Sequence, residues 1–194
     1  MPVQFFIAFY RTGDPRKYHW VLVATDDGVP SPTEPMKCFE IVPVPVLDAS
    51  GSETTVAPTW EPQHGKRTKL ADTKYQGLLM FPPCTDPSLT LEGVHNILET
   101  VPAMPPLVAQ NEMERLQWTC AKWIIDLFHE FGPMWGLDFV PRTMESETTL
   151  YYEIYKQAYK LEGNEEGFYS TVEVARDGSK VKCVHFPEKY LRTV

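Results

Sequence analysis

Proline is the residue that most restricts the folds open to this chain. Of the 194 residues, 18 are proline, which is about 9% and nearly twice the usual ~5%. Proline has no amide hydrogen to donate, and it ends or kinks an α-helix. The excess therefore predicts short elements joined by long, stiff connections, and it argues against an all-helical bundle.

The composition places the chain among soluble globular proteins of one domain. Hydrophobic residues make up 43% and charged residues 23%, and the net charge is −8. A surface of that sign repels phosphate backbones, so we expect no nucleic-acid partner. The apolar stretch at residues 5–9 is far shorter than the ~20 residues of a membrane span, and no basic segment precedes it. We expect a cytoplasmic protein.

Cysteine spacing and motif content argue against a metal or cofactor. The cysteines stand at positions 38, 84, 120 and 183, so no CxxC pair suggests zinc or a redox dithiol. We expect all of them to be reduced thiols. The sequence contains no GxGxxG, GxxxxGK[ST], HExxH or GxSxG, and we predict no cofactor.

Several segments have the composition of β-strands. Residues 3–10 and 20–24 combine β-branched and aromatic residues and flank the turn residues 11–15, which predicts a hairpin. Further strands are predicted at 37–44 and 75–81. A second hairpin is predicted from 167–175 and 180–186, around the turn at 176–179.

The remaining segments are predicted to be helices and one long loop. Residues 111–131 have apolar residues at helical spacing and end at a Gly-Pro pair, and 91–98 should form a short helix. Residues 150–161 have features of both helix and strand, and we favour helix. Residues 48–73 have the composition of a surface excursion, and His64 within it is expected to be solvated. The fold class is therefore α+β: an antiparallel sheet packed with a few helices.

Cys120 is the thiol that could be a nucleophile. A catalytic cysteine reacts as the thiolate, which a helix N-terminus and a neighbouring imidazole both stabilise. Thr119 could cap a helix beginning at Cys120, where backbone amides could also bind an oxyanion. A helix beginning at Asn111, with Glu114 at capping-box spacing, would instead place Cys120 in its third turn. Structural burial of Cys120 is the other interpretation, since free cysteine is often buried.

An early His-Trp strand precedes a late Cys-containing helix in this chain. The two segments are residues 18–23 (YHWVLV) and 118–125 (WTCAKWII). In this order of parts the chain resembles the circularly permuted papain-like families, the NlpC-related group that includes lecithin:retinol acyltransferase-like and PPPDE-type proteins. It also resembles fungal proteins that carry Trp-x-Cys-x-x-Trp-[Ile/Val] after such a strand. The resemblance covers about residues 3–131, which leaves 132–194 as a C-terminal extension of the single domain 1–194.

The resemblance implies a role for each matching residue. Cys120 would be the nucleophile and His19 the general base, and Glu40 would orient the imidazole, with Gln76 as an alternative. For substrate binding we select Trp118, Gln117 and Trp20. Thr119 stands where many relatives have Asn, and no second histidine follows His19 as in the acyltransferase branch. A general thiol hydrolase is therefore favoured over an acyltransferase.

Two other interpretations stay open from the sequence. Cys183 and His185 lie two apart on a predicted strand and are the rival thiol–imidazole pair. The chain could also be a non-catalytic interaction module in which Cys120 and His19 only pack. The substrate, a peptide or a small molecule, and the oligomeric state are not encoded in any motif that we recognise.

Overall fold

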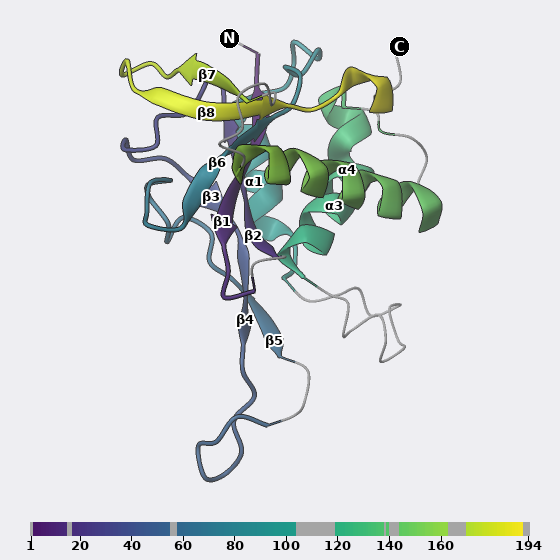
Figure 1. The fold of residues 1–194 in the computed structure, drawn as a ribbon. Helices are drawn as coiled ribbons and strands as arrows, with labels where there is room; N and C mark the ends of the chain where they lie inside the picture. Colours follow the sequence, from purple (N-terminus) through teal and green to yellow (C-terminus); the bar gives the residue numbers. More distant parts are fainter. Residues whose placement is uncertain are drawn as a thin grey trace.

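A computed structural model describes residues 2–14, 17–54, 58–103, 119–137, 139, 144–162 and 170–191. Within these ranges the chain forms a six-stranded sheet, a separate two-stranded sheet and three α-helices (Figure 1). This arrangement confirms the α+β class.

The large sheet is built from two hairpins and two further strands. Its order is β3-β2-β1-β6-β8-β7, with bounds β1 Gln4–Arg11, β2 Tyr18–Thr25, β3 Cys38–Phe39, β6 Tyr75–Met80, β7 Thr171–Val174 and β8 Lys180–His185. Every neighbouring pair is antiparallel except β6 and β8, which run parallel. Both predicted hairpins are confirmed. The C-terminal hairpin belongs to the same sheet as the N-terminal one, because β8 pairs with β6.

The prediction of one strand over residues 37–44 is wrong. The chain leaves the large sheet after β3 and pairs as β4, Ile41–Val44, with β5, Thr59–Pro62. This ribbon extends away from the body of the protein (Figure 1). Pro43 is part of the reason for this pairing. Proline has no amide hydrogen to donate, so it fits a strand such as β4 that has a neighbouring strand on one side only. Part of the predicted surface excursion 48–73 is thus the returning strand of the ribbon.

The three α-helices of the described ranges pack on one face of the large sheet. They are α1, Leu91–Thr100, α3, Cys120–Phe131, and α4, Met144–Glu162, and two short 3-10 helices follow α3 and β8 at Gly132–Trp135 and Glu188–Tyr190. Helix α4 confirms the helical interpretation of residues 150–161. The predicted helix over 111–131 is found from Cys120 onward, and its earlier part lies outside the described residues.

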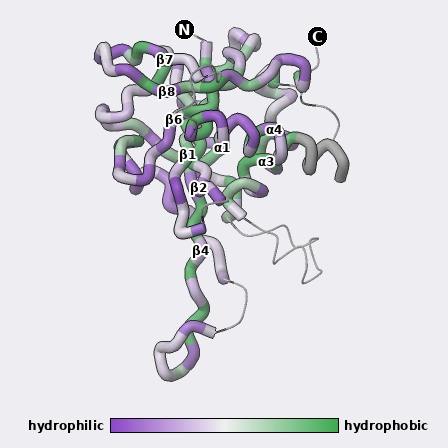
Figure 2. The backbone as a smooth tube through the Cα atoms, in the orientation of Figure 1, coloured by the Kyte–Doolittle hydropathy of each residue, from purple (hydrophilic) through white to green (hydrophobic). Residues whose placement is uncertain are grey.

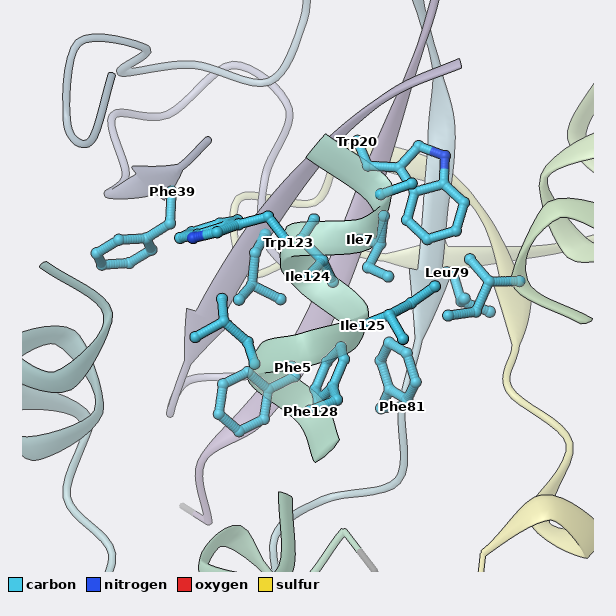
Figure 3. Close-up of a cluster of buried hydrophobic side chains, with 14 of the residues drawn as sticks. Phe5, Ile7, Trp20, Phe39, Leu79, Phe81, Trp123, Ile124, Ile125 and Phe128 are labelled. Carbon is cyan, nitrogen blue, oxygen red and sulfur yellow. The ribbon is translucent and has the colours of Figure 1, made fainter. Parts of the chain in front are cut away.

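Strand alternation divides the core between the two faces of the sheet. On the helix face, Phe5, Ile7 and Trp20 pack beneath α3, whose own apolar side chains point toward the sheet (Figure 3). On the other face, Val21 and Val23 belong to a second apolar cluster. Hydropathy follows this arrangement, with hydrophobic residues along β1 in the interior (Figure 2). Among the described residues, no helix has the length and apolar character needed to cross a membrane.

Candidate active site

Cys120 is the first residue of α3. Thr119 is extended at φ −150° and ψ 167°, and its hydroxyl accepts a hydrogen bond from the backbone amide of Lys122 at 3.1 Å. Its carbonyl accepts the first helical bond, from Trp123 at 3.0 Å. This is the geometry of an N-cap, and it confirms that α3 begins at Cys120. The thiol therefore lies at the positive end of the helix dipole, beside amides that a helix start leaves outside its own ladder.

Cys120 lies against the free edge of β2, the strand that carries His19. Strand β3 pairs only with Leu22 and Val23, so the earlier part of this edge is left for α3. There the backbone amide of Trp20 donates to the Cys120 sulfur at 3.4 Å. A hydrogen bond donated to sulfur stabilises its anionic form more than its neutral form. Cys120 itself is 7% exposed.

His19 lies between the thiol and a carboxylate. Its Nε2 is 2.6 Å from Oε2 of Glu40, and the Cys120 side chain is near enough to the ring to raise the pKa of His19. Because Nε2 faces Glu40, the nitrogen left for the sulfur is Nδ1. Burial alone would lower the pKa of His19, but the hydrogen bonds to Cys120 and Glu40, and their charges, raise it to about 9.

Glu40 is a buried carboxylate with a cation on each oxygen. It is 4% exposed, and Arg67 donates from Nε to its Oε1 at 2.9 Å. Burial alone would raise the pKa of Glu40, but the hydrogen bonds from His19 and Arg67, and their charges, hold it below its ordinary value. Glu40 lies between β3 and β4, at the point where the chain leaves the large sheet for the two-stranded one.

The turn after β5 returns the chain to the same place. The amide of Gln63 donates to the Glu40 carbonyl and that of Gly65 to the Cys38 carbonyl, both at 2.9 Å. Gly65 has a φ of +70°, a conformation that glycine adopts without strain. An open depression of about 450 Å³ lies over this turn, and it meets the histidine network at Glu40; its lining comprises Glu40, Val42, Gln63, Lys66 and Arg67.

The other residues selected from the sequence are placed differently. The Gln76 side chain donates to the carbonyls of Lys74 and Tyr75, so it is engaged with its own turn. Trp20 is 1% exposed and stacks on Tyr151 with ring centroids 5.7 Å apart, and its hydrogen bond to the sulfur comes from its backbone amide. Gln117 and Trp118 lie outside the described residues.

The rival pair of Cys183 and His185 has a different environment. Cys183 is fully buried, and burial raises the pKa of its thiol to about 12. The His185 ring is exposed and approaches Thr171 and Glu173, each at 3.3 Å. The same physical cause, burial, raises the thiol pKa of Cys38 and Cys84 to about 12. These thiols are therefore poorly suited to act as nucleophiles.

Two residues of the long loop were misjudged or missed. His64 was expected in solvent, but its ring stacks on Trp123 at 5.5 Å and both its ring nitrogens are buried. Arg67 was missed altogether, because it lies three residues beyond His64 in a segment without a motif. Its contact with Glu40 spans 27 positions of the sequence, and no local pattern reports such a contact.

The described residues contain no group of three or more His, Cys, Asp or Glu side chains arranged to hold a metal ion. Comparisons with protein-family models, with curated proteins and with solved structures found no match to this chain. The resemblance to permuted papain-like families therefore stays a prediction.

Proposed function

We propose that this protein is a cysteine-dependent hydrolase or acyl-transfer enzyme that acts on an amide, isopeptide or ester. One observation carries the proposal: the His19 ring links the thiol of Cys120, at the start of a helix, to the buried carboxylate of Glu40. Nucleophile, base and orienting group in hydrogen-bonded sequence are the arrangement that nucleophilic acyl transfer requires. The order of a histidine strand before a cysteine helix, as in permuted papain-like families, is consistent with it.

The first half of the reaction forms an acyl-thioester. His19 takes the proton of the Cys120 thiol, and the sulfur bonds to the carbonyl carbon while the C=O π electrons move to oxygen. Backbone amides at the start of α3 donate hydrogen bonds to that oxyanion. The intermediate then collapses, the bond to the leaving nitrogen or oxygen breaks, and His19 gives its proton to the leaving group.

The second half releases the acyl group. Water, or an acceptor alcohol or amine, attacks the thioester, and His19 removes a proton from this attacking molecule. The carbon–sulfur bond breaks, and the proton passes to the Cys120 sulfur, which restores the starting state. Attack by water gives hydrolysis, and attack by another acceptor gives acyl transfer. Throughout, Glu40 holds the imidazole through Nε2, so that Nδ1 stays directed at the sulfur.

Alkylation of the native protein tests the proposal. At about pH 6 an ordinary thiol is well under ~1% ionised, so it reacts slowly with iodoacetamide. We expect Cys120 to react roughly tenfold or more faster than N-acetylcysteine, as measured by peptide mapping over time. His19→Gln should abolish this advantage. His185→Gln, which alters an exposed histidine on β8, is the matched control and should preserve it.

The opposite result has a clear meaning. If Cys120 reacts no faster than N-acetylcysteine, or if His19→Gln leaves its rate unchanged, the thiol and imidazole are packing residues. The protein would then be a non-catalytic interaction module. In that case Cys120→Ala should cost only about 1 kcal/mol of stability, because a small buried side chain is lost.

A further inference from the structure

Arg67 fixes the second oxygen of the Glu40 carboxylate. Its Nε donates to Oε1 at 2.9 Å, while His19 Nε2 lies 2.6 Å from Oε2. Each carboxylate oxygen thus has its own cationic partner, and the two contacts together define the plane of the carboxylate. A rotation of Glu40 that kept one contact would break the other.

Arg67 is itself held on two further sides. Its Nη1 donates to Oδ2 of Asp72 at 2.9 Å, and its guanidinium carbon lies 4.1 Å from the centre of the Tyr10 ring. The Tyr10 hydroxyl donates to the Leu70 carbonyl at 2.9 Å, which holds the ring in place. Because a guanidinium is a rigid planar fork, these contacts fix the direction in which Nε points. Only 23% of the Arg67 side chain is exposed.

The permanent charge of Arg67 matters because His19 changes charge during the proposed reaction. When the imidazolium gives its proton to the leaving group, it no longer compensates the buried charge of Glu40. A buried carboxylate without a cation tends to take up a proton. A protonated Glu40 would donate to Nε2 of His19 instead of accepting from it. The remaining ring proton would then sit on Nδ1, the nitrogen that must next accept a proton from the attacking water or acceptor.

We propose that Arg67 is the positioning residue of this site: it keeps Glu40 an ionised acceptor through the cycle, so that His19 holds a proton beside Cys120 and, after giving it up, presents an unprotonated Nδ1 there. This inference rests on the proposed function, in which His19 is the base. Arg67 acts through Glu40 and touches neither the sulfur nor the imidazole in the described contacts. In the described part of the chain, the titratable or charged groups that interact with Glu40 are His19, Arg67, Tyr10, Cys38 and His64.

A double-mutant cycle tests whether Arg67 acts through Glu40. The variants are Arg67→Met, Glu40→Gln and the pair together, and the readout is the iodoacetamide rate of Cys120 from about pH 4 to about pH 9. Arg67→Met should lower the alkylation rate roughly tenfold at neutral pH. In the plot of rate against pH, the fall of the rate on the acid side should begin at a higher pH. In the Glu40→Gln background, Arg67→Met should cause no further loss.

Two additional variants separate positioning from general structure. Arg67→Lys keeps the charge but can meet only one of the two carboxylates well, so it should restore the position of the acid-side fall and only part of the rate. Arg176→Met is the matched control, because Arg176 pairs with Asp27 at 3.4 Å on the surface. It should leave both rate and profile unchanged. Circular dichroism of every variant confirms that the rates compare folded proteins.

A second readout keeps this inference separate from the proposed function. The pKa of Glu40 can be measured by ¹³C NMR of the carboxyl groups in glutamate-labelled protein, with the Glu40 signal assigned by its absence in Glu40→Gln. The titration midpoint of that signal should lie below 4.5 in the wild type and at a higher pH in Arg67→Met. An unchanged midpoint, or rate losses that add in the double variant, would overturn the role of Arg67. A wild-type Cys120 with ordinary reactivity would overturn the proposed function instead, whatever the midpoint.

Discussion

Replacing Glu40 by glutamine should destabilise the protein much more than such a change usually does. Both groups that contact the carboxylate are donors, Arg67 through Nε at 2.9 Å and His19 through Nε2 at 2.6 Å. Glutamine supplies one acceptor oxygen and one amide donor. One of the two contacts must therefore become donor against donor, in a place where Glu40 is 4% exposed.

The expected loss follows from these contacts. A hydrogen bond to a charged group contributes about 1.5–3 kcal/mol, and removing one partner of a buried ion pair typically costs about 3–5 kcal/mol. We therefore expect Glu40→Gln to lower the free energy of unfolding by about 3 kcal/mol at neutral pH. Glu173→Gln is the matched control, since Glu173 also contacts a histidine, His185, at 3.3 Å but on the surface. It should cost less than about 1 kcal/mol.

The pH dependence of this loss provides a second check. The pKa of Glu40 is lowered in the folded state by its hydrogen bonds and partners, against the effect of burial. Its ionisation therefore contributes stability that is fully present above about 4.5 and is lost as the pH falls through the folded-state value. Urea unfolding of wild type and Glu40→Gln should show a difference that is largest around pH 6 and shrinks in acid, as Glu40 takes up a proton, and in alkali, as His19 loses the one that Glu40 stabilises. A loss no larger than that of Glu173→Gln, or one independent of pH, would refute the reasoning.

Three other predictions concern the surroundings of the site. Thr119→Ala should cost about 1 kcal/mol of stability by removing the cap of α3, and Thr119→Ser should retain most of that stability. Equal unfolding midpoints for the wild type and both variants would contradict the capping role. In an NMR titration of the ring protons, His19 should titrate near 9 and His64, whose pKa is lowered by burial, below 6.5, so the reverse order would contradict the described environments. Gly77→Ala should destabilise the protein by about 2 kcal/mol or more in thermal unfolding. The added Cβ would lie 2.5 Å from the Lys182 carbonyl oxygen, and the backbone φ of +143° is one that alanine rarely adopts. An unchanged Tm would show that β6 and β8 are less closely packed than described.

Local patterns were sufficient for most of the secondary structure. Alternation along β2 places Tyr18, Trp20 and Leu22 on the helix face and Val21 and Val23 on the other, as the two apolar clusters confirm. The hairpins and α4 follow from turn residues and periodicity of the same short range. For the same reason, the choice of Thr119 as a cap could be made, but its competition with Asn111 could not be decided from the sequence.

Long-range contacts account for what the sequence did not predict. Residues 37–44 have one continuous strand-like composition, yet the chain changes sheets at Glu40, because the partner of β4 is β5 and lies after a long connection. Arg67 and His64 reach the interior only because the turn after β5 bonds back to Cys38 and Glu40. Glu40 itself could be selected because the resemblance implies an orienting residue on the strand after that of His19, but its contact with Arg67 could not be foreseen.

The most direct measurement is the mass of the protein after brief mixing with an activated ester such as p-nitrophenyl acetate. The account predicts one acyl group per chain, mapped to Cys120, that disappears with time in the wild type. In His19→Gln the adduct should form far more slowly. No adduct, or acetyl groups spread over lysines and other cysteines with no preference for Cys120, would contradict the central claim.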